Sequence, residues 1–340
     1  MSNDALKVDS ARFDVFLNKL RREPWLGTRA WWSKYLFHFS DIKNAVNVLN
    51  LGFLYSRHEA LKKNIIVEDS ASSHIIGNTE SALTDFVRFY FRPLTPTSYM
   101  NEGFRPAHEL YQGAHCPVPI YFLFDLIKVI THRDTRFSDG SLARYDHRIL
   151  DSADEFANLP FRDIYHNSGW GHENLERQDE IKNRRHAEAI YPTRVSLNNL
   201  EYIVCRSQAE YETLYNLLSP SVWNRWKNKV AVSKYRKLFH NEWLFIKEVN
   251  LALHHIDVGF NFPARSRSYG PFSLRVDISD NITGLTAFYE KYYEDIVSEL
   301  VKPHLELNVS KLNSSNYSVR ITINGILAYL GKYTGDEIPF

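Results

Sequence analysis

The spacing of hydrophobic and polar residues changes several times along the first third of the chain. Apolar positions over residues 10–25 recur at helical intervals and predict a helix that ends at a proline. The aromatic run at 35–39 is short and predicts a strand. Ser40 and Asp41 then cap a predicted helix over residues 42–51, whose apolar side chains share one face and which a glycine follows.

The middle of the chain mixes strand and helix signals without a regular alternation. Residues 62–85 are polar and weakly periodic, as in long loops, which are usually functional or mobile. The run "FVRFYF" predicts a strand, and residues 117–130 predict a strand that leads into a helix or a second strand. Short strands at 186–192 and 200–207 come before an amphipathic helix over 208–218. The irregular order favours an α+β fold over a doubly wound sheet.

Beyond residue 220 the pattern becomes that of a β-rich protein. Several segments alternate apolar and polar residues, which predicts antiparallel strands with one face in water. The segment "LTAFYEKYYEDIVSELV", residues 285–301, predicts one helix that interrupts these strands. We therefore place a domain boundary near residue 230.

The composition of the 340 residues is that of an ordinary globular protein. Apolar residues make up 44% and charged residues 24%, which argues against global disorder. The net charge of +1 creates no strong overall field, so a nucleic-acid partner would have to bind at a local basic patch. The two cysteines, Cys116 and Cys205, indicate neither a disulfide framework nor a cysteine-rich metal site.

The sequence carries no sign of membrane targeting. Its N-terminus has charges throughout and lacks the apolar core of a signal peptide. No apolar run approaches the roughly 20 residues needed to span a bilayer. Two scattered thiols fit a reducing compartment. We expect a cytoplasmic protein.

Common catalytic motifs are missing from the sequence. It contains no GxGxxG, P-loop or GxSxG segment, and its histidines lack metal-ligand spacing, so we expect no metal site. Glu188 follows a basic stretch, Arg184 to His186, and begins an apolar run. A carboxylate at the mouth of a strand, with basic neighbours, suits chemistry on a developing cation. Taken alone, Glu188 can also be a solvated charge, and His38 a core histidine.

Four segments occur in the order "HFSDIKNAVNVLNLGFLYSR", "FYFRPLTPTSY", "RFSDG" and "RRHAEAIYP". Together they resemble the DarT family of nucleic-acid ADP-ribosyltransferase toxins. The first is similar to the family's opening block of a histidine, an asparagine that starts a helix, and Gly, Leu and Ser-Arg. The last is similar to the block that carries the family's glutamate. The resemblance covers residues from about 30 to about 205 and does not extend to residues 230–340.

The resemblance implies an ADP-ribosyltransferase fold, a split and strongly bent antiparallel β-core with helices and a cleft that binds NAD. We therefore expect an N-terminal helical segment at residues 1–30, a DarT-like domain at 31–225 and a β-rich accessory domain at 226–340. In terms of fold class, this is an α+β protein with a C-terminal β-rich domain.

By the same resemblance, Glu188 is the catalytic carboxylate, which polarises the nicotinamide ribose. The family also has a catalytic arginine in the loop before the aromatic strand, but residues 64–86 contain no arginine. Arg57, Arg88 and Arg92 flank this loop, and we favour Arg57 because Ser-Arg belongs to the family's opening block. The residues that the resemblance assigns to NAD binding are His38, Ser40, Asn44, Leu54, Tyr90, Phe91 and Tyr99.

The aromatic run in the second segment can pack into the core with one face and line the cleft with the other. In a strand, Phe89 and Phe91 share one face and Tyr90 the other, so two rings can pack while Tyr90 faces the cleft. The two prolines that follow stiffen the turn and would bring Tyr99 and Arg92 near the dinucleotide.

The implied activity is that of an NAD-dependent nucleic-acid ADP-ribosyltransferase, a glycosyltransferase of the pentosyltransferase type. NAD is the donor and substrate, and we expect no metal. The acceptor is a base of single-stranded nucleic acid, with DNA favoured over RNA. Three alternatives stay open: the same transfer onto RNA, including mRNA; an inert nucleic-acid-binding module with the same fold; and a transferase that modifies proteins. Position 186 is a histidine where protein-directed transferases often carry an acid.

Partners follow from the resemblance and from one basic segment. A toxin of a toxin–antitoxin or antiviral defence system needs an antitoxin, here of the macrodomain type, and the C-terminal domain is a candidate to hold it or a chaperone. Residues 222–237 contain six basic residues and no acid, so this segment is either a grip on DNA or RNA or an ordinary basic helix or linker. Its basic residues are Arg225, Lys227, Lys229, Lys234, Arg236 and Lys237.

Overall fold

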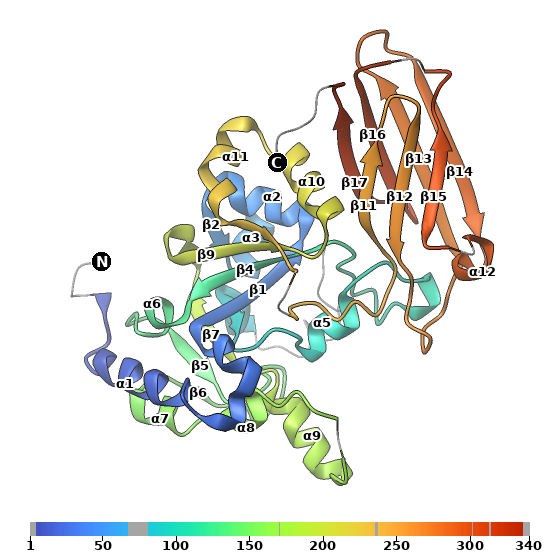
Figure 1. Cartoon of the computed structure of the whole chain (residues 1–340). Coiled ribbons are helices and arrows are strands. Elements are labelled where there is room, and N and C mark those ends of the chain that lie inside the picture. The colour runs from blue at the N-terminus through green and yellow to red at the C-terminus, as the bar shows by residue number, and fades with distance from the viewer. Residues whose placement is uncertain are drawn as a thin grey trace. The chain divides into compact units, whose positions relative to one another are not determined.

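The computed structural model describes residues 5–66, 81–169, 171–234, 237–300, 302–312 and 314–335 (Figure 1). Most of the predicted loop at 62–85 lies outside these residues. The chain forms two compact units, the first made of Met1–Ser40, Asn47–Tyr99 and Tyr121–Ile203, and the second of Asp41–Val46, Met100–Ile120 and Val204–Phe340. The division into functional segments 1–30, 31–225 and 226–340 stays a prediction.

Short helices and strands alternate irregularly in the first two thirds of the chain, and strands dominate the last third (Figure 1). The α-helices are α1 (Ser10–Leu20), α2 (Ile42–Leu51), α3 (Arg57–Lys62), α5 (Pro96–Asn101), α6 (Leu126–Ile130), α7 (Ala153–Ala157), α8 (Phe161–Ile164), α9 (Leu175–Arg184), α10 (Gln208–Leu217), α11 (Pro220–Trp226) and α12 (Ile296–Leu300). The 3₁₀ helices are η2 (Pro24–Lys34), η3 (Ser81–Asp85), η4 (Ala107–Glu109), η5 (Leu197–Asn199) and η6 (Lys227–Lys229).

The strands are β1 (Tyr35–Asp41), β2 (Phe53–Tyr55), β3 (Phe86–Tyr90), β4 (Pro119–Asp125), β5 (Arg136–Ser138), β6 (Ile149–Leu150), β7 (Glu188–Pro192), β8 (Arg194–Ser196), β9 (Leu200–Cys205), β10 (Val230–Val232), β11 (Phe245–Leu251), β12 (His255–Asn261), β13 (Phe272–Asp280), β14 (Thr286–Tyr293), β15 (His304–Asn308), β16 (Tyr317–Ile323) and β17 (Ile326–Tyr333). The strands predicted at 35–39, 86–91, 186–192 and 200–207 are therefore confirmed, and residues 117–130 form a strand followed by a helix.

One sheet of eight strands carries most of the first unit. Its strand order is β10-β9-β4-β1-β3-β7-β5-β6, with β10 in the second unit. Strand β3 pairs antiparallel with both β1 and β7, and the register aligns Tyr90 with Phe37 on one side and with Glu188 on the other. Because residues directly opposite each other share a face of the sheet, Tyr90 and Glu188 project to the same side.

The other face of β3 packs into an aromatic core. Phe89 and Phe91 are fully buried. The ring of Phe89 lies 5.0 Å from that of Phe124, and the ring of Phe91 lies 5.9 Å from that of Phe156. The prediction that Phe89 and Phe91 pack on one side while Tyr90 lies on the other face is confirmed, and the cleft beside Tyr90 stays a prediction.

The ends of the first two helices follow from local chemistry. The helix predicted over 10–25 ends earlier, at Leu20, and the chain then turns into the 3₁₀ helix η2, which starts at Pro24. Helix α2 ends where expected. Gly52 follows it with φ of +73°, a left-handed conformation that residues with a side chain adopt only under strain.

Two antiparallel sheets follow in the second unit, with strand orders β11-β12-β15 and β14-β13-β16-β17. Along β13, Leu274, Val276 and Ile278 are buried, and the residues between them are half-buried or exposed, as the alternation predicted. Asn324 and Gly325 join β16 to β17 with φ of +51° and +76°, as a type I′ hairpin turn requires. The predicted fold class, α+β with a C-terminal β-rich part, is confirmed.

The helix predicted over residues 285–301 is wrong for most of its length. Residues Thr286–Tyr293 form strand β14, and only Ile296–Leu300 form a helix. Eight residues of β14 pair in register with β13, which gives a partner to each backbone group of this edge strand that faces β13. Threonine and aromatic residues also favour strands. The helical spacing of the apolar residues was therefore overridden by a pairing partner that local sequence does not reveal.

A buried ionic cluster holds the second unit together. Arg206 forms ion pairs with Glu210 and with Glu102, whose Oε1 lies 3.6 Å from Nη1. The guanidinium carbon of Arg206 lies 3.9 Å from the ring centroid of Phe245. Glu102 also accepts hydrogen bonds from the backbone N–H groups of His240 and Asn241, in the segment that leads into β11. One arginine thus ties α10, β11 and the segment around Glu102 to one another.

Replacing Arg206 with methionine is expected to lower the free energy of unfolding by about 3–5 kcal/mol, because two buried carboxylates lose their cation. Urea denaturation followed by tryptophan fluorescence measures the change. Lys227→Met, at an exposed position of the same unit, serves as the control. A loss below about 1 kcal/mol would mean that the cluster contributes little.

Candidate functional site

Glu188 and Arg88 form an ion pair on the face of the sheet to which Tyr90 projects. Glu188 is the first residue of β7 and is only 2% exposed. Arg88 donates to it twice, from Nε to Oε2 at 2.5 Å and from Nη2 to Oε1 at 3.0 Å. Arg88 and Tyr90 lie two residues apart on β3 and so share a face. The bidentate geometry fixes both the position and the plane of the carboxylate.

The electrostatics of this pair are set by burial and by mutual attraction. Burial raises the pKa of Glu188, and the Arg88 guanidinium opposes that rise. Burial likewise disfavours the charge on Arg88, but the attraction of Glu188 outweighs it and raises the pKa of Arg88. Arg88 is thus the group that lets a carboxylate stay charged at a nearly dry position.

The "RFSDG" segment positions the start of β7. The hydroxyl of Ser138 accepts a hydrogen bond from the backbone N–H of Glu188 at 3.1 Å and donates to the carbonyl oxygen of Gly140 at 2.7 Å. A side chain at Gly140 would collide with Asn183, whose Oδ1 would lie 2.8 Å from the added Cβ. Asp139 forms an ion pair with Arg184 at 2.7 Å. The sequence singled out this segment, but its contact with Glu188 appears only in the structure.

Tyr90 forms the aromatic part of the site. Its ring is stacked on that of Phe39, with centroids 6.3 Å apart and an interplanar angle of 15°. Its hydroxyl donates to Oγ1 of Thr97 at 3.2 Å. Burial, with a further contribution from Glu188, raises the pKa of Tyr90 to about 12, so the phenol is neutral at physiological pH. Tyr90 therefore offers a fixed, flat surface beside the carboxylate.

The polar residues of the proline-rich turn have structural partners. Besides the bond from Tyr90 to Thr97, Thr95 Oγ1 accepts the backbone N–H of Ser98 at 3.0 Å. This is the hydrogen bond of a helix N-cap, and helix α5 begins at Pro96. Thr97 and Ser98 thus orient Tyr90 and start a helix. Tyr99 lies on the same helix and is 39% exposed.

His38 lies on strand β1 beside the core aromatics. Its ring centroid is 6.3 Å from that of Phe89 and 6.4 Å from that of Phe122. Its Nδ1 is 3.0 Å from the backbone oxygen of Arg88, so Nδ1 carries the proton and donates it. Burial lowers the pKa of His38, so the imidazole is neutral and Nε2 is left as an acceptor. Its neighbour Phe39, rather than His38, stacks on Tyr90.

The other residues assigned to NAD binding differ in how far they are buried. Ser40 is half-buried near the end of β1, and Leu54 is buried in β2 opposite Val195. Asn44 is buried in the first turn of α2 and belongs to the second unit. Phe91 is in the core, as described above. Their roles in binding NAD stay predictions.

The three arginines considered for catalysis differ in their surroundings and contacts. Arg57 is the first residue of α3, directly after the capping residue Ser56. Arg92 is 1% exposed and donates to the carbonyl oxygens of Ile164 and His166. Burial, with repulsion from Arg185 and Arg29, lowers the pKa of Arg92 to about 9. Arg88 is the arginine that contacts Glu188, and no local signal in the sequence distinguished it.

The basic segment at 222–237 is part helix and part strand of the second unit. Arg225 lies on α11, Lys227 and Lys229 form the ends of η6, and Lys234 and Lys237 are exposed beyond β10. Arg236 lies outside the described residues. Trp223 packs edge-on against two tyrosines of α10, Tyr211 and Tyr215. Its ring is thus occupied by packing, and a role of the basic residues in nucleic-acid binding stays a prediction.

The described residues hold neither a metal cluster nor a membrane-spanning helix. Among these, no three His, Cys, Asp or Glu side chains are grouped so that they could hold a metal ion. No helix within the described ranges is both long and apolar enough to cross a bilayer. Cys116 and Cys205 are buried free thiols.

Comparison with known proteins places this site within one family. The profile of the family described as ssDNA thymidine ADP-ribosyltransferase, DarT, matches residues 37–240, a range that contains Arg88, Tyr90 and Glu188. No curated protein matches the chain.

Solved structures of DarT proteins resemble the chain at low identity. DarT of Thermus sp. 2.9 in complex with ADP-ribosylated ssDNA is 18% identical, with a TM-score of 0.48 over 61% of this chain and 96% of that one. The same protein in complex with NAD+ is 19% identical, with a TM-score of 0.43 over 59% and 96%. Thermosipho africanus DarTG in complex with ADP-ribose is 17% identical, with a TM-score of 0.47 over 64% of this chain and 53% of that one.

Proposed function

This chain belongs to the DarT family, and we propose that it transfers ADP-ribose from NAD to a base of single-stranded DNA, with thymidine as the base that the family description names. The observation that carries the proposal is the buried Glu188 carboxylate, held by Arg88 in two hydrogen bonds and flanked by Tyr90. All three residues lie in the segment that matches the family, on one face of the ADP-ribosyltransferase sheet that the family implies.

The reaction needs a fixed negative charge at the sugar. The bond between C1′ of the ribose and the nicotinamide nitrogen breaks, and nicotinamide leaves with the bonding electron pair. A nitrogen of the acceptor base forms the new bond to C1′ and releases its proton. Positive charge develops on the ribose between these events, and a preorganised carboxylate stabilises it. Glu188 is the carboxylate in place for that role, and the flat ring of Tyr90 is placed to pack against nicotinamide.

Arg88 is the arginine that we assign to this site. It holds the Glu188 carboxylate in one orientation and keeps it charged despite burial. A guanidinium beside the carboxylate also suits a donor that carries two phosphates. The sequence favoured Arg57, and the two assignments are separated by experiment below.

Several features favour a nucleic-acid base as acceptor. The family description names single-stranded DNA. Bases in a duplex are stacked and paired, so a nitrogen of thymine is accessible only in single strands or after flipping. Burial lowers the pKa of His186, two residues before Glu188, to about 4, so this position adds no charge beside the carboxylate. RNA is the second candidate acceptor. A protein can distinguish RNA from DNA by only one or two contacts to the 2′-hydroxyl, and no sequence motif encodes such contacts.

The function is tested by offering labelled NAD together with four acceptors in parallel. These are a single-stranded DNA, its duplex, an RNA of the same sequence, and a protein extract. We expect label on the single-stranded DNA and little on the duplex. Label on RNA alone would move the acceptor to RNA, and label on protein alone would contradict a nucleic-acid acceptor. An absence of label on every acceptor would support an inert binding module.

Replacing Ser138 with alanine is expected to lower kcat about tenfold with little change in the KM for NAD, because Glu188 loses the hydroxyl that fixes its backbone. Initial rates with labelled NAD and single-stranded DNA measure both constants. Ser141→Ala is the matched control, since Ser141 lies on the same loop and its hydroxyl accepts only from Ala143 among the hydrogen bonds described. Equal rates for both variants would contradict a positioning role for Ser138.

We further propose that the protein acts as a toxin in a toxin–antitoxin or antiviral defence system, inside the cytoplasm. Modified DNA bases block replication, so an antitoxin must bind the enzyme or remove the ADP-ribose, and a macrodomain is suited to the latter. Residues 226–340 are the proposed docking region for this antitoxin or a chaperone. Expression should arrest growth, and co-expression of a macrodomain hydrolase should restore it.

A further inference from the structure

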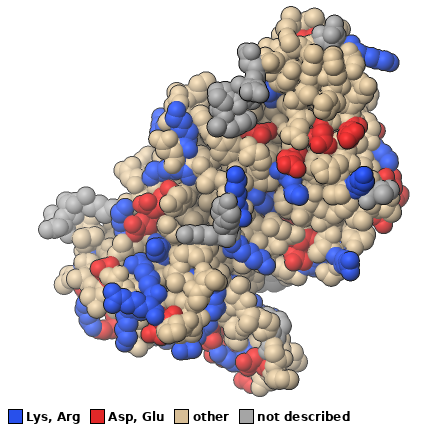
Figure 2. All heavy atoms as spheres, in the orientation of Figure 1, with Lys and Arg blue, Asp and Glu red and all other residues tan. Residues whose placement is uncertain are grey.

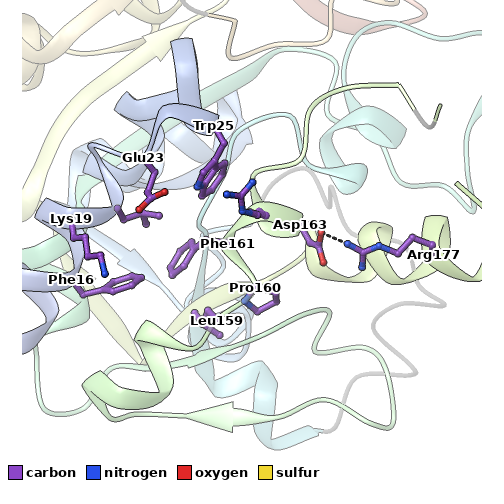
Figure 3. Close-up of a pocket in the computed structure, with 11 residues that line it drawn as sticks. Phe16, Lys19, Glu23, Trp25, Leu159, Pro160, Phe161, Asp163 and Arg177 are labelled. Atoms are coloured by element: carbon purple, nitrogen blue, oxygen red, sulfur yellow. Dashed lines mark hydrogen bonds and ion pairs between the residues drawn. The ribbon is translucent and has the colours of Figure 1, made fainter. Parts of the chain in front are cut away.

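A second site lies in the first unit, between the N-terminal helix and the segment around α8 (Figure 3). It is a pocket of about 510 Å³, within the range of small-molecule sites. Phe16, Phe161 and Trp25 supply aromatic rings to its lining (Figure 3). Five of its eleven lining residues come before position 37, outside the part that matches the family.

The pocket is built from firmly packed elements. The ring of Phe16 lies 5.6 Å from that of Phe161, and the ring of Phe13 lies 5.2 Å from that of Phe156 on α7. The carboxylate of Asp9 accepts the backbone N–H of Ala153 at 2.6 Å. Helix α1 is therefore fixed to α7 near its N-terminal end and packs against α8 through Phe16, and the pocket is preformed.

The charged residues that line the pocket differ in whether they are already paired within the protein. Arg177 is bound to Asp163 at 2.5 Å and to Glu180 at 2.6 Å, so its charge is used within the protein. Arg162 and Lys19 are exposed, and neither takes part in an ion pair with any residue that the structure describes. The guanidinium carbon of Arg162 lies 5.1 Å from the ring centroid of Trp25. The Glu23 carboxylate also lines the pocket, so Lys19 and Arg162 leave it with a surplus of one positive charge beside the half-buried indole of Trp25. Such a surface suits a flat ring that carries a negative charge.

The same pocket is tied to the candidate active site through Arg92. This buried arginine lies two residues beyond Tyr90 and donates to the carbonyl oxygens of Ile164 at 3.2 Å and His166 at 2.5 Å. It thereby clamps the end of α8, which carries Phe161 and Arg162, to the end of β3, which carries Arg88 and Tyr90. Both sites are thus mounted on one packed frame.

We propose that this pocket binds a nucleotide of the substrate strand that flanks the base being modified. The base stacks on Trp25, and its phosphate contacts Arg162 and Lys19. Figure 2 shows that Lys and Arg side chains gather over the part of the surface that α1 occupies. There, α1 and the residue after it supply Lys19 and Arg21, whereas Arg12 of the same helix is paired with Asp154. A strand can therefore run along this surface by its backbone. The proposal rests on the proposed function, because it extends the grip on the same substrate.

Binding of a dye-labelled single-stranded DNA of about 20 nucleotides to the full chain, without NAD, tests the pocket by fluorescence anisotropy. Trp25→Ala and Arg162→Glu are each expected to weaken binding about tenfold. Arg162→Glu should also flatten the dependence of log Kd on log salt by about one unit or more. The matched controls are Tyr145→Ala, at a tyrosine that is 95% exposed, and Arg148→Glu, both in the first unit and outside the pocket. These should change Kd by less than about twofold.

The outcomes are separable. Arg162→Glu changes an exposed residue, and we expect it to leave the thermal unfolding midpoint unaltered. If this variant binds the strand as tightly as the original chain, the proposal is overturned and a peptide becomes the candidate ligand of the pocket. Equal weakening with a duplex would overturn the stacking on Trp25, and parallel measurements with RNA show whether the site reads the sugar. If the pocket variants lose DNA affinity but the original chain modifies no acceptor, the proposed function fails while the binding site stands.

Discussion

Glutamine in place of Glu188 is expected to lower the rate of ADP-ribose transfer about a thousandfold. Removing one group that stabilises charge in a transition state costs about a hundred- to a thousandfold in kcat. Glutamine has the same shape and can still accept a hydrogen bond from Arg88 through its amide oxygen, so the strand pairing of β7 with β3 is kept. What it lacks is the full negative charge that, in the proposed mechanism, stabilises the ribose as the bond to nicotinamide breaks.

The decisive measurement is the pair kcat and kcat/KM with labelled NAD and single-stranded DNA. Both constants should fall equally, because the lost interaction exists only in the transition state. Glu173→Gln, an exposed carboxylate of the first unit, should leave both unchanged. In cells, Glu188→Gln should abolish growth arrest. A variant that keeps more than about a tenth of the activity would remove Glu188 from the mechanism.

Glu188 could be predicted from the sequence because its signals are local. A basic stretch, a glutamate and an apolar run lie within nine residues, and together they match the family's block. Arg88 had no such signal. It reaches Glu188 across one hundred positions of the chain, and only the antiparallel register of β3 against β7 brings the two together. Its neighbours in sequence are aromatic strand residues, and these do not indicate which strand pairs with β3 or that this strand contains a glutamate.

The same reason explains the other differences. Strand β14 was predicted as a helix because its partner β13 is separated from it by a turn that carries little pattern. The contacts of Arg92 could not be predicted either, since its Nη1 donates to backbone carbonyls more than seventy positions away. The pocket of Trp25 joins residues of α1 and α8 that no motif connects. Local periodicity thus predicts elements well, and pairings between distant elements poorly.

Glutamine in place of Arg88 is expected to lower the activity at neutral pH about a hundredfold and to move the acid limb of the pH–rate profile to higher pH. In the proposed mechanism, the active form of Glu188 is the carboxylate. Burial raises the pKa of Glu188, and Arg88 offsets part of that rise. Without the guanidinium the pKa rises further, so the charged form is reached only at a higher pH. Part of the lost activity should return as the pH is raised.

Two further variants separate the roles of charge and geometry. Arg88→Lys keeps a cation but loses the two-pronged contact, so its acid limb should lie between those of the original chain and Arg88→Gln. Arg57→Gln tests the arginine that the sequence favoured. If Arg57 contacts substrate, its loss lowers activity at every pH and leaves the acid limb in place, because it does not pair with Glu188 in the hydrogen bonds described.

The shape of the profile therefore decides between the two arginines, whatever the size of each loss. A shifted acid limb for Arg88→Gln, with an unshifted one for Arg57→Gln, identifies Arg88 as the group that sets the charge of Glu188. An unshifted limb for Arg88→Gln would mean that the ion pair seen here is not the state that reacts, and the catalytic arginine would then be sought at Arg57. Because a merely structural arginine changes rates without moving this pKa, the test does not depend on how stable the variants are.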